Sequence, residues 1–181
     1  MHNRRTCTLT LTILVLAFAL APNLSAEPFV DLGLNYTRTK GDIATVTTKV
    51  TSTQSGLHLG AGVRRELSRA SIGVRVEIDD VDGHLLLAVR AFDYRRHLSE
   101  RVSLTAFFGA ARLDLATPAY GYYLGAGAQL KDLMPKWDLN VDLRFGDKIA
   151  RDNLLPSDPQ GGRGDNFYDL RGLGIYLSRR F

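Results

Sequence analysis

Three short groups of polar residues carry side chains that could do chemistry. His97, Ser99 and Glu100 are the residue types of a hydrolase, in which a base activates a nucleophile and a third group orients the base. These three lie almost side by side in one predicted turn, whereas a working set must be brought together and held in space. A polar turn is the preferred interpretation, so we expect no catalytic residue and no enzyme.

A second group places three carboxylates, Asp79, Asp80 and Asp82, around a tight turn that ends in Gly83. Carboxylate oxygens are ligands for Ca²⁺, but the twelve-residue spacing of a calcium loop and its final Glu are missing. Asp-Gly is also a strong β-hairpin signal, which is the preferred interpretation. The four histidines of the chain have no metal-ligand spacing, so no metal and no cofactor is expected.

The third group is the tripeptide Arg163-Gly164-Asp165, which matches an integrin-type adhesion motif. Three-residue matches arise often by chance, and the neighbouring Gly161-Gly162 indicates a flexible turn. Whether the tripeptide is used stays open. The Gly-x-Gly stretches of the chain lie inside predicted strands with no helix after them, so they are not phosphate-binding loops.

The N-terminus has the pattern of a secretory signal. Two arginines precede an apolar run from Leu9 to Ala21, and Ala26 offers a small residue for cleavage. We therefore predict that residues 1–26 are a cleaved signal peptide and that residues 27–181 form one domain, with the exact cut open by a few residues. Because the only cysteine, Cys7, lies in the signal, the mature chain has no disulfide and no thiol nucleophile.

The charge balance of the mature chain argues against a nucleic-acid partner. Cleavage leaves 155 residues with 21 Lys and Arg against 19 Asp and Glu, a net charge of +2. Proteins that bind nucleic acid usually carry a strong excess of basic residues, and this net charge gives no such excess. No second apolar run approaches the length of a membrane helix, so any membrane insertion must use strands.

Apolar and polar residues alternate with period two through most of the mature chain, which predicts β-strands. Eight segments carry the pattern: 30–36, 57–63, 71–79, 85–89, 102–108, 120–128, 137–145 and 167–181. Bacterial membrane barrels have an even number of strands of about ten residues, and lipid cannot satisfy the open edge of a sheet. The predicted fold is an all-β, eight-stranded antiparallel up-and-down transmembrane β-barrel.

The connections between these segments differ in length, as in barrels with short periplasmic turns and longer extracellular loops. Two connections, 38–52 and 146–166, are long and polar. Short connections are expected at 66–70, 95–100 and 131–135 on one side, and near 79–84 and 114–118 on the other. The asymmetry predicts the long loops outside and both ends of the mature chain at the periplasmic side.

The inward face of the barrel is predicted to be polar, and buried charges there should be paired. The charged residues expected in this network are Arg64, Arg75, Glu77, Arg90, Asp138, Asp142 and Arg144. Other polar residues with the same facing are Asp31, Asn35, His58, Tyr123, Gln129, Asn140 and Tyr176. Because side chains just fill an eight-stranded barrel, an interior closed by this network is preferred, and a narrow pore is the alternative.

Aromatic residues fall near both predicted membrane boundaries, where girdles are expected. Those near the periplasmic ends are Phe29, Phe92, Tyr94, Trp137 and Phe181. Those near the outer ends are Tyr36, Tyr120, Tyr122, Phe145, Phe167 and Tyr168. By counting along the strand, Phe92 and Tyr94 have the facing of the interior, so a place at the mouth of the barrel is an alternative for both.

Three segments, 94–104, 120–127 and 173–181, resemble the small outer-membrane β-barrel superfamily, which includes the membrane domain of outer-membrane protein A and its single-domain relatives. The resemblance covers 27–181. It implies a place in the outer membrane of a Gram-negative bacterium, with lipid and lipopolysaccharide as neighbours. It also implies that the barrel-assembly machinery reads the terminal strand, here with Tyr176 and Phe181, although Arg179 departs from the usual pattern.

The function expected from these features is a structural or surface-interaction role for a monomeric barrel whose interior is plugged by polar side chains. The outer loops 38–52 and 146–166 are available for contacts. Two alternatives stay open, a pore for small solutes or ions and an enzyme acting on outer-leaflet lipid. The sequence names neither a surface partner nor a physiological role.

Overall fold

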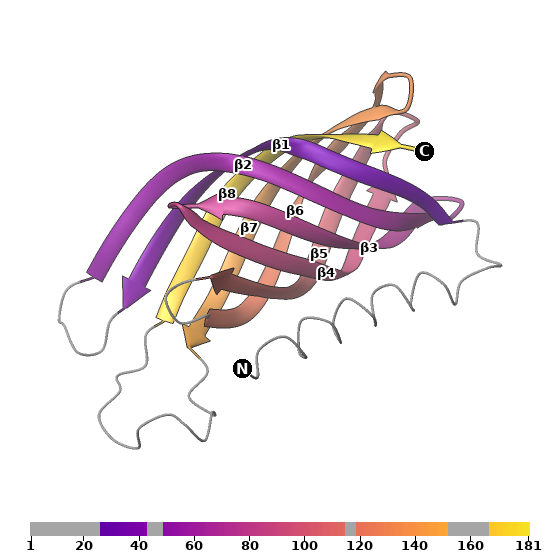
Figure 1. Cartoon of the computed structure of the whole chain (residues 1–181). Coiled ribbons are helices and arrows are strands. Elements are labelled where there is room, and N and C mark those ends of the chain that lie inside the picture. Colours follow the sequence, from indigo (N-terminus) through magenta and orange to yellow (C-terminus); the bar gives the residue numbers. More distant parts are fainter. Residues whose placement is uncertain (1–25, 43–48, 115–118, 152–166) are drawn as a thin grey trace, which may run out of the picture.

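The computed structural model describes residues 26–42, 49–114, 119–151 and 167–181, which form a closed barrel (Figure 1). Each strand pairs antiparallel with its neighbours in chain order, and β8 closes the sheet against β1. The strands are β1 (Ala26–Asp42), β2 (Lys49–Glu66), β3 (Ala70–Val81), β4 (His84–His97), β5 (Val102–Asp114), β6 (Ala119–Met134), β7 (Trp137–Arg151) and β8 (Phe167–Arg180). The predicted all-β, eight-stranded fold is therefore confirmed.

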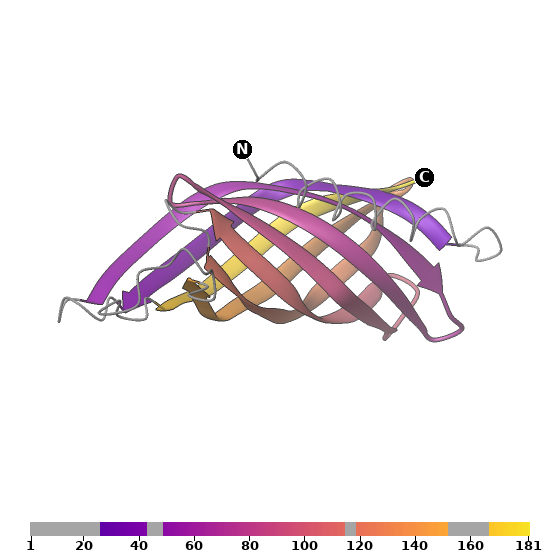
Figure 2. The same cartoon turned by 60° about the horizontal axis from the view of Figure 1, so that its bottom comes forward.

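The barrel is apolar outside and polar inside, which is the reverse of a soluble protein. Leu32, Leu34 and Leu57 point outward and are each about 60% exposed, while the polar residues beside them, Asp31, Asn35 and His58, are buried. The strands wrap into a barrel in the two side views (Figures 1 and 2). Within the described residues, no helix has the length and apolar character needed to cross a membrane.

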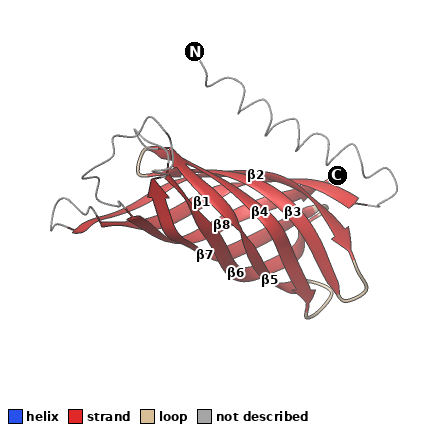
Figure 3. Cartoon of the chain, turned by 90° about the horizontal axis from the view of Figure 1, so that it is seen from below, coloured by secondary structure: helices blue, strands red, loops and turns tan. Residues whose placement is uncertain are grey.

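Three short turns lie at one end of the barrel, together with the C-terminus, and this is called the short-turn end (Figures 1 and 3). The turns occupy 67–69, 98–101 and 135–136. The opposite end carries the β3–β4 turn, where Asp82 and Gly83 both have positive φ angles, 58° and 72°. Two such residues make the tight hairpin turn that suits twisted strands, so the predicted Asp-Gly hairpin is confirmed.

The two long loops are shorter than predicted, because the strands continue into them. β1 runs to Asp42 and β2 begins at Lys49, so only 43–48 remain of the predicted loop 38–52. β7 runs to Arg151, six residues into the predicted loop 146–166. Beyond a membrane both faces of a sheet meet water, and a strand there needs no apolar alternation. The polar composition of these residues therefore predicted loops, whereas the chain there forms paired β-strands.

A β-bulge in β4 changes which residues face the interior. The register with β3 shifts between Gly73 and Arg75, and the register with β5 shifts between Arg90 and Phe92. An extra residue in one strand moves every following side chain to the other face. Phe92 is 52% exposed on the outside, so the alternative that placed Phe92 and Tyr94 on the inner face is wrong.

Gly109, on the inner face of β5, has no room for a side chain. A Cβ atom there would lie 1.8 Å from the carbonyl oxygen of Val89 on the neighbouring strand. Gly109→Ala should lower the free energy of unfolding by about 1–3 kcal/mol, because the backbone of β4 must shift. Gly41→Ala is the control, since its nearest atom belongs to the Tyr168 ring at 3.2 Å. Equal urea midpoints for the two variants in detergent would contradict this packing.

Candidate functional site

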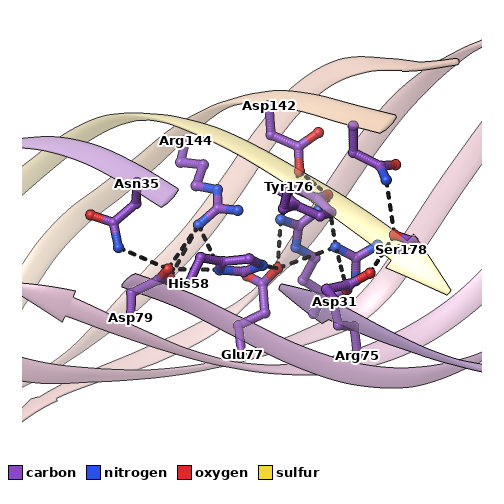
Figure 4. A network of polar contacts seen from close by, with 12 residues as sticks. Asp31, Asn35, His58, Arg75, Glu77, Asp79, Asp142, Arg144, Tyr176 and Ser178 are labelled. Carbon is purple, nitrogen blue, oxygen red and sulfur yellow. Dashed lines mark hydrogen bonds and ion pairs between the residues drawn. The ribbon is translucent and has the colours of Figure 1, made fainter. Parts of the chain in front are cut away.

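Polar side chains from all eight strands are buried inside the barrel, and Figure 4 shows those around Glu77 and Asp79. The seven charged residues predicted for this place are all at most 5% exposed. The seven other polar residues predicted to share the inner face are also buried. Alternation with period two puts them there, since the opposite face of each strand carries the apolar side chains. This set is called the buried polar network.

Glu77 lies at the centre of the network. Its Oε1 atom is 2.7 Å from Nη2 of Arg90 and 3.4 Å from Nη1 of Arg75. Arg90 also reaches Asp142, with Nη2 2.8 Å from Oδ2. Charges from β3, β4 and β7 are thereby joined across the interior, which ties strands that are not neighbours in the sheet.

Tyr176 links Arg75 to Asp142 across the centre of the network. Its hydroxyl accepts a hydrogen bond from Nη1 of Arg75 at 2.7 Å and donates one to Oδ2 of Asp142 at 2.6 Å. Arg75 also forms ion pairs with Asp31 and Asp93, each at 3.1 Å. Four of the eight strands therefore converge on the side chain of Arg75.

At the end opposite the short turns, Asp79 gathers the contacts. Its carboxylate is 3.1 Å from Nη1 of Arg144 and 2.7 Å from Nδ1 of His58, and it accepts a hydrogen bond from the amide of Asn35 at 3.1 Å (Figure 4). Of the three carboxylates considered for calcium, Asp79 thus faces the interior. Among the described residues, no group of three His, Cys, Asp or Glu side chains could hold a metal ion.

Towards the short-turn end, the partners of the network are mostly neutral. Asp138 accepts a hydrogen bond from Gln129 at 2.8 Å and lies 3.2 Å from Nε of Arg180. Arg95 donates to the amide oxygen of Asn140 at 2.9 Å. These contacts join β4, β6, β7 and β8 near the short-turn end.

Arg64 is the exception, because no carboxylate among the described residues lies within 4 Å of it. It is 2% exposed, and its guanidinium lies 4.4 Å from the centre of the Phe29 ring. Phe29 itself is buried inside the barrel, so its predicted place in the aromatic girdle is wrong. A cation over an aromatic face is a favourable contact when both are desolvated, which explains why this ring points inward.

The charges of the interior nearly cancel. Five arginines and six carboxylates are buried in the described part of the chain. Arg180, at the rim, supplies a sixth cation through its contact with Asp138. Balance of this kind is what a low-dielectric interior demands, since an unpaired buried charge costs several kcal/mol.

The structure does not bring His97, Ser99 and Glu100 together. His97 instead lies between Ser103 and Glu66, with Nδ1 2.9 Å from the serine Oγ and Nε2 2.9 Å from the glutamate Oε2. Ser103 is 0% exposed, so no substrate can reach its hydroxyl. Ser99 accepts a hydrogen bond from the backbone N–H of Val102, which closes the turn.

A small pocket lies at the end of the network opposite the short turns. The pocket there is lined by Thr37, Asp79, Tyr123, Arg144 and Leu170 and has a volume of about 10 Å³. A single water molecule needs about this volume. Phe107, Tyr123 and Leu170 pack together beside it, so the interior here combines polar contacts with an apolar layer.

The sequence did not point to every buried charge. Asp93 and Arg95 lie inside because of the bulge in β4, and no residue pattern marks that bulge. Ser103, Thr105 and Ser178 also face the interior, and the alternation within β5 and β8 could have found them. Arg163-Gly164-Asp165 lies outside the described residues, as does the predicted signal peptide except for Ala26.

The C-terminal residues that resemble an assembly signal face in different directions. Tyr176 is buried in the network, while Phe181 is 57% exposed. The guanidinium of Arg179 lies 5.7 Å from the Trp137 ring and 5.4 Å from the Phe181 ring, on the outside of the barrel. Cation–π contacts thus accommodate the unusual arginine. The role of these residues in assembly stays a prediction.

Comparison with known proteins identifies the fold. No protein-family model and no curated protein matches the sequence. Among solved structures, Ail, the attachment invasion locus protein of Yersinia pestis, is similar with a TM-score of 0.54 and 12% identity over 87% of this chain and 100% of that one. A complex of Ail with the heparin analogue sucrose octasulfate gives a TM-score of 0.52 and 14% identity over the same shares.

Neisserial surface protein A is similar to the same degree, with a TM-score of 0.52 and 12% identity over 87% of this chain and 99% of that one. These likenesses span the whole barrel of each neighbour, and the closed order β1 to β8 agrees with them. At such low identity they establish the fold and leave the activity open. The chain has the fold of the small eight-stranded outer-membrane β-barrels.

Proposed function

We propose that this chain is a monomeric outer-membrane β-barrel, closed to solutes, whose role is structural support and contact at the cell surface rather than catalysis or transport. An apolar outer face supports the membrane location, since a closed sheet leaves no unsatisfied edge in lipid. The short turns then lie in the periplasm and the opposite end faces outward.

The observation that carries the surface role is an arm of strand that continues beyond the barrel wall. β2 pairs with β3 only from His58 onward, so residues 49–57 pair with β1 alone. The arm projects past the neighbouring β3–β4 turn (Figures 1 and 3). Among the described residues no strand pairs with the other edge of 49–55, so the backbone N–H and C=O groups there can pair with an extended segment of a partner. The exposed side chains of the arm from 51 to 55, which are Thr51, Thr53, Gln54 and Ser55, are polar, and the apolar Leu57 lies at its base.

Closure of the barrel is supported by the buried polar network. Ion pairs cross the interior from β3 to β7, and the outer pocket holds about one water. An eight-stranded barrel has no spare diameter once large side chains fill it. Conductance measured in planar bilayers tests this part, since steady channels in the wild-type protein would favour the pore.

Lipopolysaccharide is the outer-leaflet partner that the charges favour. Arg38 on β1 and Arg171 on β8 lie directly opposite each other, and both are exposed. Like charges in that position repel, and neither has an ion-pair partner among the described residues. Two positions closer to the proposed membrane, Tyr36 and Leu173 form the next pair whose side chains point away from the barrel interior. Two arginines just beyond an aromatic boundary can bind a lipid phosphate with charge-assisted hydrogen bonds.

Replacing both arginines should weaken retention of lipopolysaccharide. Arg38→Gln with Arg171→Gln removes the two donors, and we expect about tenfold lower affinity, which corresponds to about 1.4 kcal/mol. Lipopolysaccharide that copurifies or rebinds to the folded barrel is quantified by mass spectrometry. Arg69→Gln with Arg101→Gln, at the short-turn end, removes the same charge and should change nothing. Equal loss in both double variants would mean that net charge alone drives binding.

A further inference from the structure

A groove of about 330 Å³ lies on the outer face of the barrel near the short-turn end. Its lining includes the outward side chains of Val63 on β2, Ile72 and Val74 on β3, and Ala91 and Phe92 on β4, together with Ala26, Arg64, Arg65 and Gly73. This volume falls in the range of small-ligand sites. The lining is predominantly apolar, so the groove suits a hydrocarbon chain.

The bulge in β4 creates this groove. Ala91 and Phe92 both face outward at the register shift, opposite Val74. The small side chain of Ala91 leaves a hollow, and the large ring of Phe92 forms one wall. Regular alternation would have placed a single side chain here and left no space. The groove is therefore a local feature of the fold rather than general roughness of the surface.

Cationic side chains stand at the short-turn side of the groove. Arg65 lines it directly, and it pairs in register with Ile72. Arg96 follows two residues after Tyr94 on the same outward face of β4. Both arginines are exposed, and neither has an ion-pair partner among the described residues. The nearby Glu66 is engaged by His97 at 2.9 Å and by Lys131 at 3.7 Å.

We propose that this groove is a binding site for an anionic glycerophospholipid of the periplasmic leaflet. One acyl chain lies in the apolar groove, and the phosphate meets Arg65 and Arg96 at the rim. The spacing of groove and arginine suits a chain with a headgroup at its end. Arg96 lies four residues after Phe92, and four steps along a strand cover roughly 13 Å. An anionic headgroup is favoured over a zwitterionic one, since an added ammonium would be repelled by the same arginines.

The inference rests on the proposed outer-membrane location, which sets the lipid that the groove meets. The test uses the barrel folded in detergent, incubated with equal amounts of phosphatidylglycerol and phosphatidylethanolamine and then measured by native mass spectrometry. The wild type should retain phosphatidylglycerol preferentially. Arg65→Gln with Arg96→Gln should reduce that retention about fivefold for each arginine removed.

A second variant tests the groove independently of charge. Ala91→Phe fills the hollow with an outward side chain, and it should reduce phosphatidylglycerol retention while both arginines remain. Arg101→Gln with Lys136→Gln, in the β4–β5 and β6–β7 turns outside the groove, is the charge control and should retain the lipid normally. Heat-modifiable migration on gels reports whether each variant is folded before lipid is added.

The outcomes separate the two proposals. A barrel that does not insert into lipid vesicles contradicts the membrane location itself. Inserted barrel that retains the two phospholipids equally, or that keeps phosphatidylglycerol in both groove variants, overturns the site alone. Preferential retention of lipopolysaccharide that Ala91→Phe abolishes would also overturn it, because the groove would then serve an outer-leaflet lipid.

Discussion

Replacing Glu77 with alanine should lower the free energy of unfolding by about 3–5 kcal/mol, the usual effect of breaking a buried ion pair by removing one partner. Glu77 is 0% exposed and contacts Arg90 at 2.7 Å and Arg75 at 3.4 Å. Without it, Arg90 keeps only Asp142 as a partner within 4 Å among the described residues. The interior then holds one cation too many.

Two comparisons separate charge from packing. Glu77→Gln keeps the shape of the side chain and removes its charge, so it should be destabilising even though it leaves no cavity. Asp114→Ala breaks an exposed pair with Arg112 at 3.2 Å and should cost about 0–1 kcal/mol. Urea unfolding of the barrel in detergent, followed by tryptophan fluorescence, gives the three values. A midpoint of Glu77→Ala equal to that of Asp114→Ala would contradict the central role of this carboxylate.

The same variants test the proposed closure of the interior. If the ties between Glu77, Arg90 and Asp142 hold the interior shut, their loss should allow intermittent current where the wild type shows none. Single-channel recording of wild type and Glu77→Ala in planar bilayers measures this difference. Silent wild-type barrels together with brief openings in the variant are the expected result.

The fold could be predicted because membrane insertion imposes a strict pattern. Lipid on one face and packed polar side chains on the other leave a period of two in every strand, as Leu139, Asn140 and Val141 illustrate. The buried charges followed from the same count. The partner of each charge did not, since Arg90 on β4 meets Asp142 on β7 only across the closed barrel, which no alternation encodes.

One failure of prediction comes from a local departure from regular alternation. The bulge at Ala91 and Phe92 exchanged the two faces of β4, so Asp93 and Arg95 were missed. Phe29 looked like a girdle residue because it is aromatic, but it has the inward facing of Asp31, and the Arg64 guanidinium packs on its ring. The bulge also creates the groove proposed to bind lipid. Irregular positions thus carry functional information that a periodic pattern hides.

The orientation of β7 in the membrane predicts the other large effect. Val141 lies midway between Trp137 and Phe145, the aromatic residues at the two ends of its outward face. It is 38% exposed and pairs in register with Ala128 and Ile175, which also face outward. An arginine at the midplane must expose its charge to hydrocarbon. Val141→Arg should therefore cost about 2–4 kcal/mol in lipid bilayers.

A matched arginine outside the apolar belt shows whether depth is the cause. Thr53 is exposed on the β2 arm, and Thr53→Arg should cost about 0–1 kcal/mol, as for sites near or beyond the interface. Urea unfolding in vesicles compares the two. Facing is tested separately by single cysteines at 140 and 141, which is straightforward because Cys7 lies in the predicted signal. A lipid-soluble probe should label position 141 and spare the buried position 140, and equal labelling would refute the assigned orientation of the strand.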